Sequence, residues 1–200
     1  MKEIILASNN ENKIKEISNL LSDFGVKVRS LKELGLGDPI EDGENFKENS
    51  LIKAKFGFEK TGLPSLADDS GFCVESLNDF PGLCSARFAD ACGSYDEAFR
   101  IINECINPIN KKAYFITSIA FIYKDKKDKI IENTFEGKID GSFVYPKRGN
   151  NGFAYCPVFQ PNGYDKTFGE LTNELRTSIN HRRLALDKFL NFFKRLNGQL

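Results

Sequence analysis

The pattern of apolar and polar residues predicts strands alternating with helices in the first half of the chain. Residues 2–7 form a short apolar run bounded by polar residues, which is typical of a buried strand. Apolar residues over 14–24 then recur at helical spacing, and Gly25 supplies a natural stop before a strand at 26–28. A second amphipathic helix is predicted at 45–60, with four residues facing the core: Phe46, Leu51, Ala54 and Phe58.

The second half adds a hairpin and further helices. Residues 113–123 give the longest strand signal, and 129–139 are predicted to be its antiparallel partner. The segment between them, 124–129, mixes both signs of charge and is predicted to be an exposed loop. Helices are predicted at 95–105 and 181–196, the latter with four core residues: Leu184, Leu186, Leu190 and Phe193. Together these elements favour a mixed α/β fold with a partly antiparallel sheet.

Composition narrows the class of protein. The 200 residues are 40% hydrophobic and 28% charged, as in an ordinary globular protein. Lysine plus arginine number 28, equal to aspartate plus glutamate, so no basic field points to a nucleic acid or membrane partner. No apolar stretch reaches about 20 residues and no secretory leader is present, so we expect a cytoplasmic protein. Five cysteines without CxxC spacing predict reduced thiols rather than disulfides or a zinc site.

Two adjacent acids carry the most informative chemistry. Asp68 and Asp69 follow the apolar run 63–67 and precede Ser70 and Gly71. Carboxylates at the mouth of a strand can hold a divalent cation or take a proton from water. Glycine lets the backbone turn sharply and approach a ligand closely. The segment therefore predicts a hard-metal or phosphate site.

Two segments before these acids could complete such a site. Residues 8–13 lie at a strand-to-helix turn, where backbone N–H groups, amides and Lys13 can cradle an anion. The same residues are also compatible with an ordinary helix cap and a surface lysine. An acidic stretch at 38–49 precedes Lys53. Its acids either complement the helix dipole or supply a second carboxylate to Mg²⁺, and Lys53 could reach a phosphate.

A third segment, residues 149–183, combines aromatic and basic groups. Phe153 and Tyr155 are equally compatible with stacking on a planar base and with packing in the core. His181 is the only histidine, and a lone histidine is more often structural than catalytic. Beside Asn180 and two arginines, however, it belongs to a cluster of hydrogen-bond donors suited to phosphate or carbonyl oxygens.

Taken in order, these motifs resemble those of the inosine/xanthosine triphosphate pyrophosphatases, which hydrolyse deaminated purine nucleoside triphosphates to monophosphate and pyrophosphate. Each motif alone is weak, but their order and spacing are specific, and they cover nearly the whole chain. The matching segments are residues 7–13, 48–49, 53–54, 67–71, 80–89, 152–157, 167–171 and 180–182.

The resemblance implies a fold, a cofactor and an assembly. The expected fold is α/β, two-lobed and elongated, with a central mixed sheet flanked by helices and an active-site cleft between the lobes. Residues 1–200 would form a single pyrophosphatase domain whose two lobes are not independent domains. The expected substrate is a purine nucleoside triphosphate bound with Mg²⁺, and the expected assembly is a homodimer.

The resemblance also assigns roles to residues. Asp69 matches the general base and a Mg²⁺ ligand, whereas Asp68 is expected to support the turn. Glu41 is the best candidate for a second metal carboxylate, with Glu44 or Asp42 as alternatives. The matches to the triphosphate site are Ser8, Asn9, Asn10, Glu11, Asn12, Lys13 and Lys53, and Ser70 matches a substrate-contacting position. The matches to the base-reading segments are Phe153, Ala154, Tyr155, Cys156, Arg176, His181 and Arg182.

The base-reading region departs from the family pattern. The family's bacterial members usually read Gly-Phe-Gly-Tyr-Asp-Pro, so Ala154 replaces a glycine and Cys156 an aspartate. Arg176 stands where lysine is usual, and Asn180 where serine is usual. A thiol is a poorer hydrogen-bond acceptor than a carboxylate. We therefore expect hydrolysis to survive and purine selectivity to be relaxed or weakened.

Two other classes of function make distinct predictions. A nucleotide-binding protein of the same fold with altered base selectivity and no turnover would release no pyrophosphate from ITP with Mg²⁺. An RNA-binding module would use the basic segments 176–183 and 188–195. Zero net charge and the helical spacing of these segments oppose that interpretation, and a salt-dependent RNA shift assay would decide it.

Overall fold

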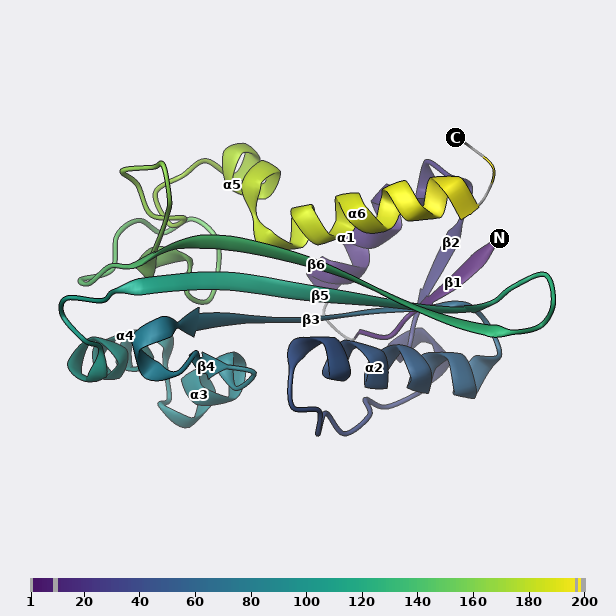
Figure 1. Cartoon of the computed structure of the whole chain (residues 1–200), viewed down its shortest axis with the longest axis horizontal. Coiled ribbons are helices and arrows are strands. Elements are labelled where there is room, and N and C mark those ends of the chain that lie inside the picture. The colour runs from purple at the N-terminus through teal and green to yellow at the C-terminus, as the bar shows by residue number, and fades with distance from the viewer. Residues whose placement is uncertain (1, 9–10, 197, 199–200) are drawn as a thin grey trace. The chain divides into compact units, whose positions relative to one another are not determined.

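A computed structural model of the chain describes residues 2–8, 11–196 and 198, and within them it contains a mixed sheet of seven strands (Figure 1). The strand order is β2-β1-β3-β5-β6-β7, with β4 paired to β3. β1 runs parallel to β2 and β3, whereas the β3–β4 and β6–β7 pairs are antiparallel. The strand bounds are β1 Glu3–Leu6, β2 Lys27–Ser30, β3 Ser65–Val74, β4 Phe80–Gly82, β5 Lys112–Lys124, β6 Ile130–Phe143 and β7 Phe159–Pro161.

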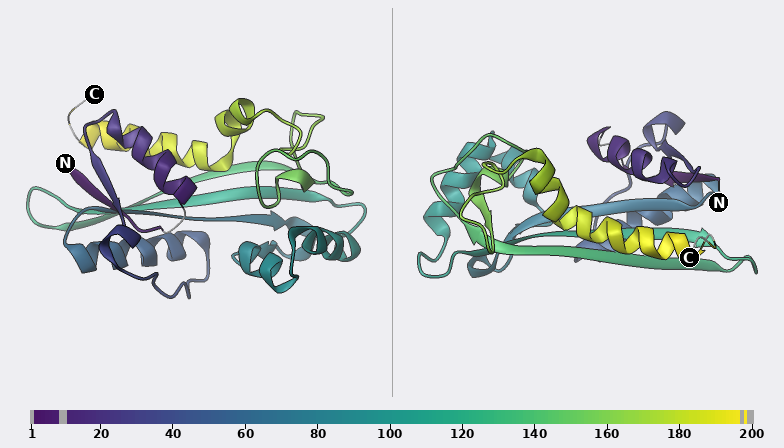
Figure 2. Two further views of the ribbon diagram at one scale, coloured as in Figure 1. Left: turned by 180° about the vertical axis from the view of Figure 1, so that it is seen from behind. Right: turned by 90° about the horizontal axis from the view of Figure 1, so that it is seen from above.

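Helices flank this sheet, so the predicted mixed α/β class is confirmed (Figure 2). The described α-helices are α1 Glu11–Ser22, α2 Phe46–Thr61, α3 Ser85–Ala91, α4 Tyr95–Cys105, α5 Asn173–Ile179 and α6 His181–Leu196. Three single-turn 3₁₀ helices lie at Lys32–Leu34, Glu75–Leu77 and Cys156–Val158. No helix in the described part of the chain is long and apolar enough to span a membrane.

The helices at 45–60, 95–105 and 181–196 were predicted correctly, and so was the hairpin. β5 and β6 are neighbours in the sheet and are joined by the turn 125–129, where the Asp125 N–H donates to the Lys129 carbonyl at 2.9 Å. A connection this short allows only an antiparallel pair. One predicted core position in α6 is wrong, because Leu184 is 40% exposed and lies beside the buried stripe rather than on it.

The expectation that a strand ends at Asp68 and Asp69, with Asp68 supporting the turn that follows, is also wrong. Both residues lie inside β3, which continues from Ser65 to Val74 without interruption. Residues 65–67 of the apolar run and residues 70–74 after the acids therefore belong to one strand. The acids are tolerated within it because their side chains find ion-pair partners.

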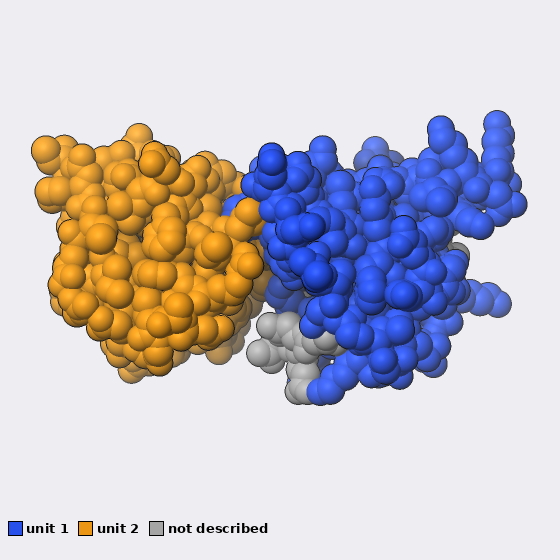
Figure 3. Space-filling view, turned by 90° about the horizontal axis from the view of Figure 1, so that it is seen from below, with its two compact units in different colours: residues 1–69, 118–136, 186–200 blue, residues 70–117, 137–185 orange. Residues whose placement is uncertain are grey.

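The chain divides into two compact units (Figure 3). Unit 1 comprises residues 1–69, 118–136 and 186–200, and unit 2 comprises residues 70–117 and 137–185. β3, β5, β6 and α6 contribute residues to both units. The expectation of a single domain with a cleft between lobes stays a prediction.

In unit 1 the sheet is covered on both faces. α2 lies against one face, and α1 lies with the C-terminal part of α6 against the other (Figures 1 and 2). β5 shows the alternation that this requires. Ala120 and Ile122 pack in the cluster that contains Ala54 of α2. Phe121, between them, contacts Phe189 of α6 at a ring distance of 5.3 Å.

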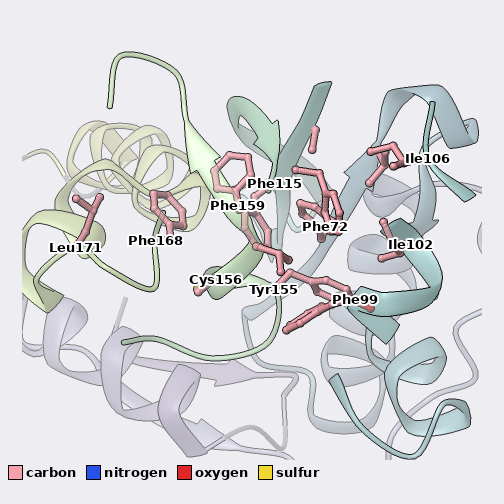
Figure 4. Close-up of a cluster of buried hydrophobic side chains, with 14 residues drawn as sticks. Phe72, Phe99, Ile102, Ile106, Phe115, Tyr155, Cys156, Phe159, Phe168 and Leu171 are labelled. Atoms are coloured by element: carbon pink, nitrogen blue, oxygen red, sulfur yellow. The ribbon is translucent and has the colours of Figure 1, made fainter. Parts of the chain in front are cut away.

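The core of unit 2 is dominated by aromatic rings (Figure 4). Phe72 of β3 stacks on Tyr155 with ring centroids 4.8 Å apart, and Phe115 of β5 packs against Phe159 and Phe168. Such rings bury large apolar areas and favour the edge-to-face and stacked geometries seen here. Cys156 belongs to the same buried cluster.

Candidate active site

The side chains of Asp69 and Lys53 meet in unit 1. The Lys53 ammonium donates to Oδ1 of Asp69 at 2.9 Å, and Oε1 of Glu41 lies 3.3 Å from the same nitrogen. The side chains of Lys53 and Asp69 are only 11% and 13% exposed. Because one buried ammonium faces both carboxylates, Glu41 and Asp69 are brought to the same site although 28 positions separate them in the sequence.

Local structure explains how α2 presents its side chains to β3. Asn45 caps the helix: its side chain accepts from the Glu48 N–H at 2.9 Å, while the Glu48 carboxylate accepts from Asn45 and from the Glu44 N–H. This reciprocal cap fixes where α2 begins. Asn49 and Lys53 then lie one turn apart on the same face of the helix.

Asn49 is a site residue to which the sequence assigned no role. It is 2% exposed, its amide nitrogen lies 3.5 Å from Oδ2 of Asp69, and its oxygen accepts from the Gly43 N–H at 2.9 Å. A Cβ at position 43 would lie 2.7 Å from that oxygen, so this close approach requires glycine. Asn49 thus ties the loop that carries Glu41 to Asp69. The sequence offered one signal for this role, because Asn49 lies four residues before Lys53 and therefore on the same face of the predicted helix.

Asp68 has a partner on the other face of the sheet. Its carboxylate is 1% exposed and lies 2.7 Å from the ammonium of Lys13 on α1. Successive residues of a strand point to opposite faces, so Asp68 meets α1 while Asp69 meets α2. The expected turn-supporting role of Asp68 is wrong, because the residue anchors Lys13 from within a strand.

Negative charge is in excess at this site. Burial raises the pKa of Asp69, and the charges of Glu41 and Asp68 raise it further, while Lys53 opposes them. Burial works against the charged form of Lys53, yet Asp69, Asp68 and Glu41 together raise its pKa. Asp69 and Glu41 thus share the ammonium group of Lys53, while Asp68, paired with Lys13 on the other face, adds a third negative charge nearby. The site favours bound cations.

This donor set fits a magnesium ion that is completed by its ligand. Mg²⁺ takes one or two protein carboxylates together with phosphate oxygens and water. Asp69 and Glu41 supply two carboxylates that already face one cation. Within the described residues, no three Asp, Glu, His or Cys side chains form a ready-made cage. The alternatives to Glu41 are both in the same exposed loop, and Glu44 is tied to Glu48 through its backbone N–H.

The predicted anion cradle is described only in part. Lys13 lies in the first turns of α1, which begins at Glu11, and Ser8 precedes that helix. Asn9 and Asn10 lie outside the described residues, as do the side chains of Glu11 and Asn12. The contribution of this segment to a triphosphate site stays a prediction.

The predicted base-reading residues lie in unit 2, and they differ from one another in burial and in their contacts. Tyr155 is 1% exposed within the aromatic core, and its hydroxyl donates to the Ser85 carbonyl at 2.8 Å. Phe153 is 63% exposed. Between them, Ala154 has a φ of +52°, a conformation that favours glycine. The hydroxyl of Ser70 lies 2.8 Å from that of Thr117.

Cys156, Arg176 and Arg182 come together, and we call them the arginine–thiol cluster. A Cβ added at Gly152 would lie 2.4 Å from Nη1 of Arg176 and 2.8 Å from the sulfur of Cys156, so both groups converge on this glycine. Burial raises the pKa of the Cys156 thiol, while the positive charges of Arg176 and Arg182 oppose that rise.

His181 and Asn180 stand at the start of α6. The His181 ring stacks on Phe115 with centroids 4.9 Å apart and an interplanar angle of 12°. The Asn180 side chain accepts from the Arg183 N–H at 2.8 Å. Asn180 therefore acts in capping, whereas His181 is held flat against a core ring.

Comparison with known proteins gives a consistent result. The model of the Ham1 family matches residues 4–192. Proteins named dITP/XTP pyrophosphatase are 40% identical over 191 residues in Zymomonas mobilis, covering 94% of this chain and 90% of the relative, and 39% identical over 197 residues in Leptospira interrogans, covering 96% and 98%.

Solved structures agree with these sequence matches. The Ham1 protein of Staphylococcus aureus has a TM-score of 0.87 at 31% identity, covering 96% of this chain and 98% of its own. A nucleoside-triphosphatase / dITP/XTP pyrophosphatase from Mycobacterium abscessus has a TM-score of 0.76 at 34% identity, covering 94% and 98%.

Proposed function

The chain belongs to the Ham1 family. We propose that the reaction for which its relatives are named takes place in unit 1, at the acidic site formed by Asp69, Glu41, Asp68, Lys53 and Lys13. The protein is a nucleoside triphosphate pyrophosphatase that hydrolyses deaminated purine nucleoside triphosphates (ITP, dITP and XTP) to nucleoside monophosphate and pyrophosphate. The family resemblance and this activity, both inferred from the motifs, are confirmed.

The observation that carries the assignment to unit 1 is the buried Lys53 ammonium facing Asp69 and Glu41. A triphosphate brings about four negative charges, so its site must offer positive charge and room for a cation. Asp69 and Glu41 would hold Mg²⁺. When bound, this ion offsets phosphate charge and makes a coordinated water more acidic.

Asp69 orients the attacking water and accepts its proton. Water attacks the α-phosphorus, and the bond from that phosphorus to the oxygen bridging to the β-phosphorus breaks, so that pyrophosphate leaves. The raised pKa of Asp69 suits a proton acceptor, since a base works best when its pKa approaches the working pH. Asn49 keeps its carboxylate in place.

Lys13 and Lys53 offset the charge that moves onto the leaving pyrophosphate. Each is held by an aspartate, Lys13 by Asp68 and Lys53 by Asp69, so their ammonium groups are placed before substrate arrives. Ser8, the amides of 9–10 and the start of α1 would complete the phosphate contacts.

Base recognition falls to donors in unit 2. Hypoxanthine and xanthine present an acceptor at O6, where adenine presents an amino group. Arg176, His181 and Arg182 are donors that would favour the keto bases, and the exposed Phe153 ring offers a stacking surface. A donor left without its acceptor loses one to several kcal/mol, roughly enough for discrimination against adenine.

We further propose that the enzyme works in the cytoplasm as a homodimer and as one domain, with neither nucleic acid nor membrane as a partner. The zero net charge and the family resemblance support this proposal. Size-exclusion chromatography with light scattering checks the assembly, and a monomer at micromolar concentration would contradict it.

A substrate panel tests the function. Pyrophosphate release is measured from ITP, dITP, XTP, GTP and ATP with Mg²⁺ and with EDTA. We expect rapid release from the first three and loss of release in EDTA, while release from GTP and ATP should be slower by a margin that relaxed purine selectivity makes small. Binding of ITP without any pyrophosphate would favour the nucleotide-binding alternative instead.

A further inference from the structure

The arginine–thiol cluster is buried. Cys156 is 7% exposed and Arg182 is 8% exposed. Nη1 of Arg176 is also buried and has no hydrogen-bond acceptor among the residues that the structure describes, whereas Nη2 of the same side chain donates to Oδ1 of Asn173 at 3.0 Å. The acceptor that Arg176 does have is a neutral amide, so its charge is not compensated there.

The acid of the adjoining loop is occupied elsewhere. Glu170, in the adjoining loop, lies 3.4 Å from Arg148 and accepts from the Thr167 N–H at 2.9 Å. Cys156 stays a neutral thiol, because burial raises its pKa. The Arg176 guanidinium thus lies close to a side chain that carries no charge of its own, and the positive charge of Arg182 also acts on that side chain.

A guanidinium group without an acidic partner should bind xanthine and hypoxanthine with different strength. Xanthine has carbonyl groups at C2 and C6 and loses a ring proton near neutral pH, so its nucleotides carry a largely anionic base. Hypoxanthine has one carbonyl and stays neutral under the same conditions. Guanidinium groups bind anionic oxygens more strongly than neutral ones, and charge-assisted hydrogen bonds are roughly twice as strong.

We propose that the arginine–thiol cluster makes the enzyme prefer XTP, with its anionic xanthine base, over ITP. This inference rests on the proposed function, because it concerns the base site of the same reaction. Cys156 is the residue that determines the preference. A carboxylate at this position would pair with the unmatched Nη1 of Arg176, neutralise the positive charge of that guanidinium and repel an anionic base.

The test compares kcat/KM for XTP with kcat/KM for ITP in one protein at a time. The ratio cancels every effect on phosphate binding and hydrolysis that both substrates share. We expect the wild type to favour XTP, and Cys156→Asp to lower the XTP-to-ITP ratio roughly tenfold or more, as like-charge contacts do. Cys156→Ser, which adds no charge, should keep the wild-type ratio.

Two further variants separate charge from damage to the fold. Arg176→Gln removes one positive charge without adding a negative one and should also lower the ratio. Cys105→Asp makes the same substitution at an exposed cysteine of unit 2 and should leave the ratio unchanged. If Cys156→Asp fails to fold, Arg176→Gln and Cys156→Ser still decide the question.

Binding of the reaction products gives a readout without turnover. Calorimetry with XMP and IMP should show the same order of affinity and the same loss of preference in Cys156→Asp. A wild type that prefers ITP, or a ratio unchanged in both Cys156→Asp and Arg176→Gln, would overturn the proposal. Absence of pyrophosphate from every triphosphate would instead overturn the proposed function.

Discussion

The acidic site of unit 1 and the arginine–thiol cluster of unit 2 differ in whether their cationic side chains are paired with carboxylates. In the acidic site both lysines face a carboxylate: Lys53 faces Asp69 and Lys13 faces Asp68. In unit 2 the Arg176 side chain donates to an amide and lies with a neutral thiol beside Gly152. Lysines already held by carboxylates suit a reaction that moves charge between phosphates, whereas an unmatched cation suits recognition of an anion.

The two regions also differ in how they are built. The acidic site lies on a strand and a helix, whose geometry fixes side-chain spacing, and the sequence there keeps the family motifs. The residues around Cys156 lie in turns and short helices. Loops tolerate change better than regular elements do. This explains why the departures from the family pattern fall in the base-reading region.

The largest expected effect tests the acidic site directly. Asp69→Asn removes the proposed proton acceptor, which is also a proposed metal carboxylate, so we expect kcat for ITP to fall by more than about 10²-fold. Asp23→Asn changes an exposed aspartate of unit 1 and should have no effect. Steady-state kinetics decides, and near-normal turnover in Asp69→Asn would remove this residue from the mechanism.

Lys53→Met tests whether the paired charges serve catalysis. The change leaves Asp69 and Glu41 without their shared cation, and it also removes one positive charge that would contact the triphosphate. We therefore expect kcat/KM to fall about 10²-fold for ITP and XTP alike. Lys55→Met, on the same helix but paired to Glu132 at the surface, is the matched control. A fall for only one substrate would show that the two regions are not separate in function.

Asn49→Ala tests the tie between the Glu41 loop and Asp69. Losing the amide should lower kcat/KM about tenfold and lower the free energy of unfolding by about 1–3 kcal/mol, because the Gly43 N–H loses its acceptor. Asn45→Ala removes the cap of the same helix and should cost about 1 kcal/mol of stability with kcat/KM unchanged. Equal kinetics in the two variants would reduce Asn49 to a structural role.

The pH dependence of kcat/KM reports on the same carboxylate. Asp69 must be ionised to accept a proton, and its pKa is raised by burial and by Glu41 and Asp68. Activity should therefore decline, as pH falls, at a higher pH than an ordinary aspartate would give. Glu41→Gln removes a negative charge and should move this decline to lower pH, while Glu44→Gln should not. Identical profiles would contradict the coupling.

The smallest expected effect lies in unit 2 and concerns the backbone. Ala154 has a φ of +52°, which costs an alanine about 1–2 kcal/mol relative to its preferred conformations. Ala154→Gly should therefore raise the free energy of unfolding by roughly 0.5 kcal/mol once the added freedom of the unfolded chain is subtracted. Urea unfolding measures this change. Ala86→Gly, in α3, should instead destabilise the protein.

Regular elements were predictable because their signals are local. The helix at Tyr95–Cys105 and the helix at His181–Leu196 have the predicted bounds, and both follow from apolar spacing. Leu184 was misplaced because the buried stripe of α6 runs through Ala185, Leu186, Phe189 and Phe193, one position away.

What the sequence did not predict depends on distant partners. Acidic and small residues at 68–71 look like strand breakers, yet Lys13 and Lys53 stabilise the two acids inside β3, and tertiary contacts outweigh strand propensity. The bridge from Asn49 to Asp69 spans 20 positions. The convergence of Arg176 on Cys156 spans the same number and carries no local signal.

The parallel pairing of β1 with β3 decides which of two neighbouring aspartates faces Lys53 and Glu41. Ile5 lies opposite Ser65 and Leu6 opposite Leu66, which sends Asp68 toward Lys13 and Asp69 toward Lys53. A slip of one residue along β1 would exchange the two faces. A folded chain with that error would keep every atom of both ion pairs and bring Asp68 rather than Asp69 to Lys53, so under the proposed mechanism catalytic fidelity begins as accurate strand alignment during folding.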